Sequence, residues 1–125
     1  MKAGYYKGWN TGFVKEFLNN LKIDGQRKKA GAKLRYDLDV LEEFWPKIQN
    51  TNITVKSLKG YDPLKELIRE YQGIAYRIFF CVVNDEIWLL HAIEKKEQKT
   101  PQSDLETAYN RMKNVLEGRV KRGEI

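Results

Sequence analysis

The chain has 125 residues and a net charge of +6, and 42% of its residues are hydrophobic. This length corresponds to one domain. The basic balance favours a polyanionic partner (nucleic acid, an anionic membrane surface or an acidic protein), although a basic protein without such a partner is an equally good interpretation. One cysteine and one histidine exclude a disulfide framework and an ordinary Cys/His zinc site, so no metal and no other cofactor is expected. No apolar run reaches the ~18 residues of a membrane span, and the start lacks an apolar signal segment, so we expect a cytoplasmic protein.

Two amphipathic helices are predicted in the first third of the chain. After a short strand at Ala3–Lys7, apolar residues recur at helical spacing over Phe13–Leu21, with Thr11 as the N-cap. The second helix is expected at Gln26–Phe44 and ends before Pro46, because the residue that precedes a proline disfavours helix. These two helices should form a hairpin.

Strands dominate the middle of the chain. The sequence predicts them at Ile53–Leu58, Leu64–Tyr71, Ile74–Val83 and Ile87–Ile93, where β-branched and aromatic residues are frequent. Asn84-Asp85 suits a two-residue turn between the last two.

A closing helix is predicted at Gln102–Glu117, with Gly118 as its stop. Two different N-terminal signals are present. Pro101 suits the first helical position with Thr100 as the cap, whereas Ser103–Glu106 has the pattern of a capping box.

The order of these elements predicts one α+β domain over residues 1–118, followed by a frayed tail at 119–125. In this plan an N-terminal helix hairpin and a C-terminal helix pack on one side of a small, mainly antiparallel sheet.

Several enzyme plans are excluded by missing motifs. The chain has no Gly-rich phosphate loop, no dinucleotide-binding GxGxxG pattern and no GxSxG elbow. A Cys81/His91 nucleophile pair is formally possible, but Cys81 lies inside an apolar strand, which makes this pair a poor candidate.

Arg77 is the most informative residue, because it interrupts an otherwise apolar strand. A charge at such a position is costly unless it reaches an edge, a partner or a ligand. With a regular two-residue turn, Arg77 would face Ala92 and Tyr76 would face Ile93. This register predicts that Arg77 lies near Lys95 and Lys96, which follow the return strand. Whether Arg69 joins them depends on the Gln72-Gly73 turn, since a two-residue turn would put Arg69 on the opposite face.

Such a cationic cluster suits metal-free RNA cleavage, in which the ribose 2′-OH attacks the adjacent phosphate. Arginine can stabilise the phosphorane bidentately, and a lysine among other cations can act as the base. Tyr76 or His91 could stack on a base or donate a proton.

Each of these residues also has a structural interpretation. Arg77 can pair with Glu66 or Glu94, and Lys95, Lys96 and Lys99 can form a solvated loop. His91 can be a partly buried strand residue, and Tyr76 can belong to the core.

Three segments resemble the RelE/ParE toxin superfamily, and most closely its phage-derived, HigB-like branch. They are Leu64–Arg69, Tyr76–Phe80 and the stretch from Leu89-Leu90-His91 to Lys99-Thr100-Pro101. The branch has a strand that ends in Glu-Leu-Arg, whereas this chain has Glu-Leu-Ile-Arg, with one residue more before Arg69.

The resemblance implies a RelE-like fold and a toxin of a type II toxin–antitoxin system. Such a toxin is an endoribonuclease that cuts mRNA on the ribosome and is held in check by an antitoxin protein. Carried over by position, the catalytic set is Arg69, Arg77, Lys95, Lys96 and His91, and the RNA-binding set is Tyr76, Lys99 and Arg111.

Two other functions remain open: a ParE-like inhibitor of a topoisomerase, and a catalytically inactive regulator that binds nucleic acid. On the endoribonuclease hypothesis, we expect Arg77→Ala to abolish RNA cleavage and to leave the fold intact.

Overall fold

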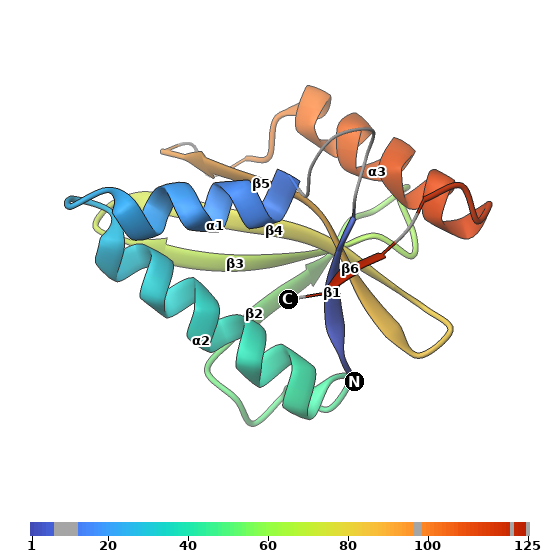
Figure 1. The fold of residues 1–125 in the computed structure, drawn as a ribbon, viewed down its shortest axis with the longest axis horizontal. Helices are drawn as coiled ribbons and strands as arrows, with labels where there is room; N and C mark the ends of the chain where they lie inside the picture. Colours follow the sequence, from blue (N-terminus) through green and yellow to red (C-terminus); the bar gives the residue numbers. More distant parts are fainter. Residues whose placement is uncertain (7–12, 97–98, 121, 125) are drawn as a thin grey trace.

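The computed structural model describes residues 1–6, 13–96, 99–120 and 122–124. Within them, six strands form one sheet in the order β2-β3-β4-β5-β1-β6 (Figure 1). The strands are β1 (Ala3–Tyr6), β2 (Thr54–Ser57), β3 (Lys65–Tyr71), β4 (Ile74–Val83), β5 (Glu86–Lys95) and β6 (Arg122–Glu124). Neighbouring strands are antiparallel, apart from the parallel pair β1–β5. The predicted α+β fold with a mainly antiparallel sheet is therefore confirmed.

Three helices accompany the sheet in this part of the chain: α1 (Phe13–Ile23), α2 (Lys28–Phe44) and α3 (Gln102–Leu116). α2 begins two residues later than predicted, because the carboxylate of Asp24 accepts the backbone N–H of Gln26 (2.9 Å) in the turn between α1 and α2. The predicted cap Thr11 lies outside the described residues.

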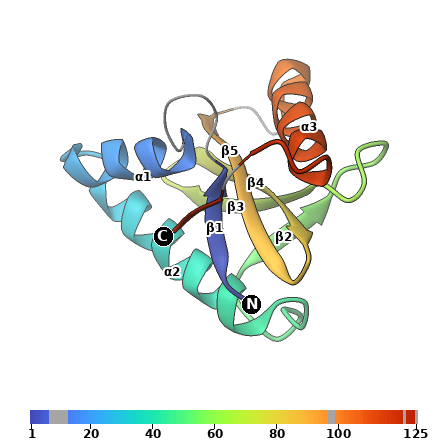
Figure 2. The same cartoon turned by 45° about the vertical axis from the view of Figure 1, so that its right-hand side comes forward.

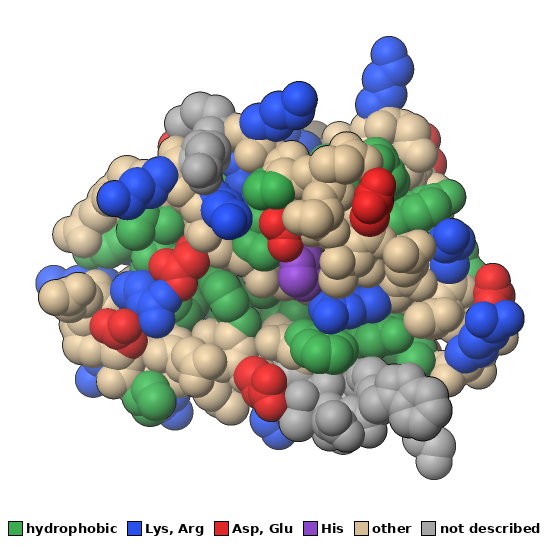
Figure 3. All heavy atoms as spheres, turned by 90° about the horizontal axis from the view of Figure 1, so that it is seen from above, with side chains coloured by type: hydrophobic (Ala, Val, Ile, Leu, Met, Phe, Trp, Pro, Cys, Tyr) green, Lys and Arg blue, Asp and Glu red, His purple; other side chains and the backbone are tan. Residues whose placement is uncertain are grey.

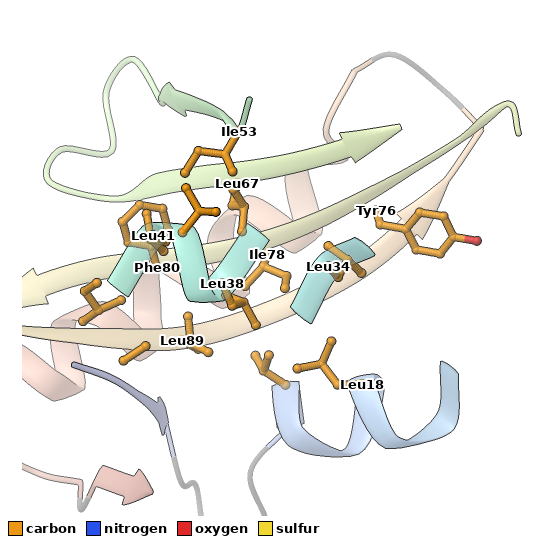
Figure 4. Close-up of a cluster of buried hydrophobic side chains, with 14 of the residues drawn as sticks. Leu18, Leu34, Leu38, Leu41, Ile53, Leu67, Tyr76, Ile78, Phe80 and Leu89 are labelled. Atoms are coloured by element: carbon orange, nitrogen blue, oxygen red, sulfur yellow. The ribbon is translucent and has the colours of Figure 1, made fainter. Parts of the chain in front are cut away.

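The main core lies between the α1–α2 hairpin and one face of the sheet (Figure 4). Its side chains follow the predicted helical spacing on α1 and α2 and alternate along the strands. They include Leu18, Leu34, Leu38, Leu41, Ile53, Leu67, Tyr76, Ile78, Phe80 and Leu89. We call this side of the sheet the α2 face.

A second core lies on the opposite side of the sheet, which we call the α3 face (Figure 2). Ala108, Met112 and Val115 of α3 pack there with Phe79 and Leu90. The prediction that all helices cover one side was therefore wrong. β4 is apolar on both faces, so it can bury both of them only if helices lie on both sides.

Both hairpin turns have two residues, which confirms the prediction for Asn84-Asp85 and settles the Gln72-Gly73 turn that the sequence left open. Gln72 and Gly73 have φ values of 51° and 79°, and Asn84 and Asp85 have values of 52° and 60°. Positive φ at both central residues is the signature of the type I′ turn, whose twist matches that of the strands. Across the first turn Tyr71 pairs with Ile74, which fixes the register of β3 on β4.

The β4–β5 register differs from the prediction by one residue. Arg77 pairs with Ile93 and Tyr76 with Glu94, because a β-bulge lies where Phe79 pairs with His91 while Phe80 pairs with Leu89. The extra residue in β5 is Leu90. A bulge turns every later side chain to the other face. Lys95, which pairs with Ala75, therefore shares the α3 face with Arg77.

The C-terminal segment is part of the sheet, so the expectation of a frayed tail was wrong. β6 pairs with β1, and Nη1 of Arg122 lies 3.2 Å from Oε2 of Glu86. Gly4 leaves room for this side chain, because a Cβ at Gly4 would lie only 2.6 Å from Cζ of Arg122.

Neither predicted cap of α3 is used. Pro101 is the N-cap residue, and no side chain caps the helix there. Thr100 bonds elsewhere, as described below. At the other end Gly118 has a φ of 69° and stops the helix as predicted. None of the described helices is long and apolar enough to cross a membrane.

Candidate functional site

Arg77 lies on the α3 face and is almost fully buried, with 4% of its surface exposed. Its Nη1 lies 2.7 Å from Oε1 of Glu66 and 3.1 Å from Oγ1 of Thr100. The hydroxyl of Thr100 donates to the other carboxylate oxygen of Glu66, at 2.7 Å. The structural interpretation of Arg77 as the partner of Glu66 is therefore confirmed. The opposite charges of Arg77 and Glu66 compensate each other. Because Thr100 bonds to both, the network also attaches the segment before α3 to the sheet.

A groove of about 280 Å³ lies over β2, β3 and β4, with Arg77 among its lining residues. The other lining residues are Asn52, Thr54, Lys56, Ile68, Arg69 and Glu70. Lys56 is exposed and brings a positive charge to the groove. Sequence reasoning missed it. The signal that could have revealed Lys56 is the alternation of side chains in β2. Val55 faces the main core, so Lys56 faces the other side of the sheet.

Three lysines lie at the end of β5 or shortly after it. Lys95 is partly exposed and lies in one cross-strand row with Ala75 and Glu70. Lys96 is exposed and lines a second hollow of about 290 Å³ beside the β3–β4 turn. Lys99 is also exposed. Arg77, Lys95 and Lys96 thus occupy the same end of the sheet, as predicted.

Arg69 is among the lining residues of the groove, but its guanidinium does not join this group of cations. Its Nε donates to Oδ2 of Asp37 at 2.8 Å, and Asp37 belongs to α2 on the opposite side of the sheet. The bond to Asp37 raises the pKa of Arg69 above its ordinary value. The residue on the α3 face at this position is Ile68, which pairs with Arg77. The segment Glu-Leu-Ile-Arg thus places Ile68 on the α3 face and turns Arg69 to the α2 face.

Tyr76 is separated from the site as well. It is only 2% exposed and belongs to the main core on the α2 face. Burial raises the pKa of its hydroxyl above the ordinary value. This matches the structural interpretation of Tyr76 and leaves it out of reach of RNA.

His91 stands in a polar network between β5 and α3. Its Nε2 lies 2.8 Å from Oδ1 of Asp104, and its Nδ1 lies 3.2 Å from Nη1 of Arg111. Because a guanidinium can only donate, Nδ1 must accept, and Nε2 carries the proton that bonds Asp104. Burial lowers the pKa of His91 below its ordinary value, while the bond to Asp104 opposes the shift. The neutral ring is therefore held from both sides.

This network reaches the surface of the molecule. Figure 3 shows the histidine side chain among acidic, basic and apolar side chains. Arg111 also donates to the carbonyl of Leu90 (2.8 Å), and its Cζ lies 3.7 Å from the ring centre of Phe13. Sequence reasoning missed Asp104, which was assigned only to a capping box. The contacts bind α3 to β5 and leave both nitrogens of His91 occupied.

The environment of Cys81 disfavours its use as a nucleophile. Cys81 is fully buried, and burial raises the pKa of its thiol to about 12. Among the residues that the structure describes, no three His, Cys, Asp or Glu side chains gather closely enough to hold a metal ion. The arrangement offers cations, a carboxylate and a neutral histidine around an open strand surface.

The element order and the basic end of the sheet are consistent with a small α+β toxin fold. Residues 21–113 match the family model described as phage derived protein Gp49-like (DUF891), a RelE/ParE-like toxin family. The chain therefore belongs to the phage-derived Gp49-like family. Comparison with curated proteins and with solved structures gives no significant match.

Proposed function

We propose that this protein is the toxin of a type II toxin–antitoxin system and that it cleaves mRNA on the ribosome. The observation that carries the proposal is a set of three lysines, which we call the basic rim. Lys56 lines the groove, Lys96 lines the neighbouring hollow, and Lys95 lies in one cross-strand row with Glu70, which lines both. Membership of the Gp49-like family and the net charge of +6 support it. The expected partners are mRNA, the ribosome and an antitoxin protein, and no membrane is involved.

In the proposed reaction, the ribose 2′-oxygen attacks the adjacent phosphorus and the bond from phosphorus to the 5′-oxygen breaks. The products are a 2′,3′-cyclic phosphate and a new 5′-hydroxyl end. Lys95 and Lys96 stabilise the phosphorane, and Glu70 in the groove accepts the proton of the 2′-hydroxyl. A lysine of the rim then donates a proton to the leaving 5′-oxygen.

The test is a reconstituted translation reaction in which new mRNA 5′ ends are mapped with and without ribosomes. We expect new ends only with ribosomes. The variant Lys95→Ala/Lys96→Ala should cleave RNA at least about 100-fold more slowly than the wild type, because loss of a group that stabilises charge in the transition state lowers the rate by about this factor. The matched control is Lys15→Ala/Lys22→Ala, which removes two exposed charges from α1. Equal rates for the two variants would contradict the assignment of the rim.

A second candidate is a catalytically inactive module that binds RNA, and the contact between Arg77 and Glu66 favours it. A carboxylate at 2.7 Å already satisfies part of this guanidinium, and burial further limits its access to a phosphate. This function predicts no new ends in any reaction. It also predicts salt-dependent binding of single-stranded RNA that the Lys95/Lys96 variant weakens.

A further inference from the structure

The charges of α2 run against its own helix dipole. Its first turn holds no acidic residue and its last turn no basic one. Lys28 and Lys29 stand at the N-terminus, and Glu43 stands near the C-terminus. Acidic residues stabilise a helix at the N-terminus and basic residues stabilise it at the C-terminus, so this order destabilises an isolated helix.

On the outward side of α2, the charged residues are arranged symmetrically about Tyr36, with the basic ones toward the N-terminus and the acidic ones toward the C-terminus. Lys29, Lys33, Tyr36, Asp39 and Glu43 are all exposed. Relative to Tyr36 they stand at −7, −3, +3 and +7, which are positions on one side of a helix. The two lysines are four residues apart, as are the two acidic residues, and like charges at this spacing repel.

These charges find little compensation within the chain. Within the described residues, Lys29, Asp39 and Glu43 form no ion pair or hydrogen bond, and Lys33 lies over the ring of Tyr71 at 5.4 Å. Other charged side chains of α2, namely Arg35, Asp37 and Glu42, bond elsewhere in the protein. Asp37 holds Arg69, and Glu42 accepts the backbone N–H of Ala3.

We propose that a second copy of this chain docks on the outward side of α2, with the two helices antiparallel and Tyr36 on the two-fold axis. In this arrangement Lys29 faces Glu43 of the other copy, and Lys33 faces Asp39. Each helix end also meets the opposite end of the other dipole. α2 lies along the outside of the molecule (Figure 2), and Tyr36 is 56% exposed there.

The charges favour a second copy over a wholly acidic or wholly basic partner. A uniform partner would match one half of α2 and repel the other half. A segment with the same order of charges, laid antiparallel, matches both halves, and α2 itself is such a segment. One helix from each copy makes a small interface, so the dimer is weak and depends on concentration.

The test is sedimentation equilibrium of the full chain over a range of concentrations at low and high salt. We expect a monomer–dimer equilibrium that salt weakens. Lys29→Glu/Lys33→Glu should raise the dimer Kd about 10-fold or more, and so should Asp39→Lys/Glu43→Lys. A mixture of these two variants should form a heterodimer, because the four charged positions on the outward side are then all acidic in one helix and all basic in the other. Lys15→Glu/Lys22→Glu, on exposed positions of α1, should leave Kd unchanged.

Tyr36→Cys gives a second measurement that does not rely on charge. Cys residues on the two-fold axis should form a disulfide between copies under mild oxidation, whereas Lys15→Cys should not. The native Cys81 is fully buried and does not compete. A wild-type chain that stays monomeric at every concentration overturns the proposal. A dimer whose Kd is unchanged by the charge reversals, and in which Tyr36→Cys forms no disulfide, also overturns the proposal.

Discussion

Arg77 and Glu66 form the most tightly enclosed charge pair described on the α3 face, with 5% and 2% of their side chains exposed. Their burial has a consequence for experiments on function. Loss of either partner leaves the other as a buried charge that lacks its main compensation. We therefore no longer expect Arg77→Ala to leave the fold intact. A loss of activity in that variant would have two causes, the missing guanidinium and the unfolding of the protein.

We expect Arg77→Met to lower the free energy of unfolding by about 3–5 kcal/mol, the usual cost of breaking a buried pair. The double variant Arg77→Met/Glu66→Leu should recover most of this loss, because it leaves no buried charge of the pair. Urea denaturation of the wild type and of the three variants, including Glu66→Leu alone, measures both effects. A double variant as unstable as the sum of the single ones would show that the two charges are not coupled.

His91 makes stability depend on pH in a defined direction. Burial lowers its pKa in the folded protein below the ordinary value of 6.5. Neutral His91 therefore contributes stability above pH 6.5, and this contribution is lost as the pH falls through the lowered folded pKa. The decline in unfolding free energy from about pH 7.5 to about pH 5 should be smaller in His91→Gln, which cannot titrate. Identical declines in the two proteins would mean that His91 titrates alike when folded and unfolded.

At the scale of elements, strand and helix positions could be predicted because local periodicity determines them. β4 was predicted to the residue, and the type I′ turn at Asn84-Asp85 follows from residues that tolerate positive φ. The faces of Arg69 and Arg77 also followed, once Gln72-Gly73 was known to be a two-residue turn.

The β-bulge at Leu90 could not be predicted, since the first half of β5 is a continuous apolar run that is buried on both faces and gives no alternation from which to fix the register. It decides which lysine shares a face with Arg77, because each residue of register exchanges the two faces. The use of Thr100 could not be foreseen either. Its hydroxyl bonds Glu66 from a distant strand, and local capping rules cannot detect such a competing partner.

At the scale of the whole molecule, two helical layers enclose a sheet in which the strands from the two ends of the chain, β1 and β6, lie side by side at one edge. β6 shields the outer edge of β1, which otherwise presents unpaired backbone groups. The basic groove and the outward side of α2 lie on different sides of the molecule, so the two proposals can be tested independently.

Ending the chain at Gly118 should lower the free energy of unfolding by about 1–3 kcal/mol, because the β1–β6 hydrogen bonds are lost. It should also promote aggregation through the exposed edge of β1. Thermal unfolding and light scattering measure the two effects. The full-length variant Arg122→Ala removes the ion pair with Glu86 and retains the strand, so it separates the two contributions. A truncated chain as stable as the full one would mean that β6 adds nothing to the sheet.

The placement of β1 also bears on how the protein is made. Ala3 pairs with Ile87, and Gly4 pairs with Glu124. A chain that emerges from the ribosome at about 5–20 residues per second makes its first strand on the order of ten seconds before the partners of that strand appear. The sheet can be completed only after the residues of β5 and β6 have been synthesised. A nascent chain that still lacks these two strands therefore leaves β1 without its neighbours and exposes both of its edges.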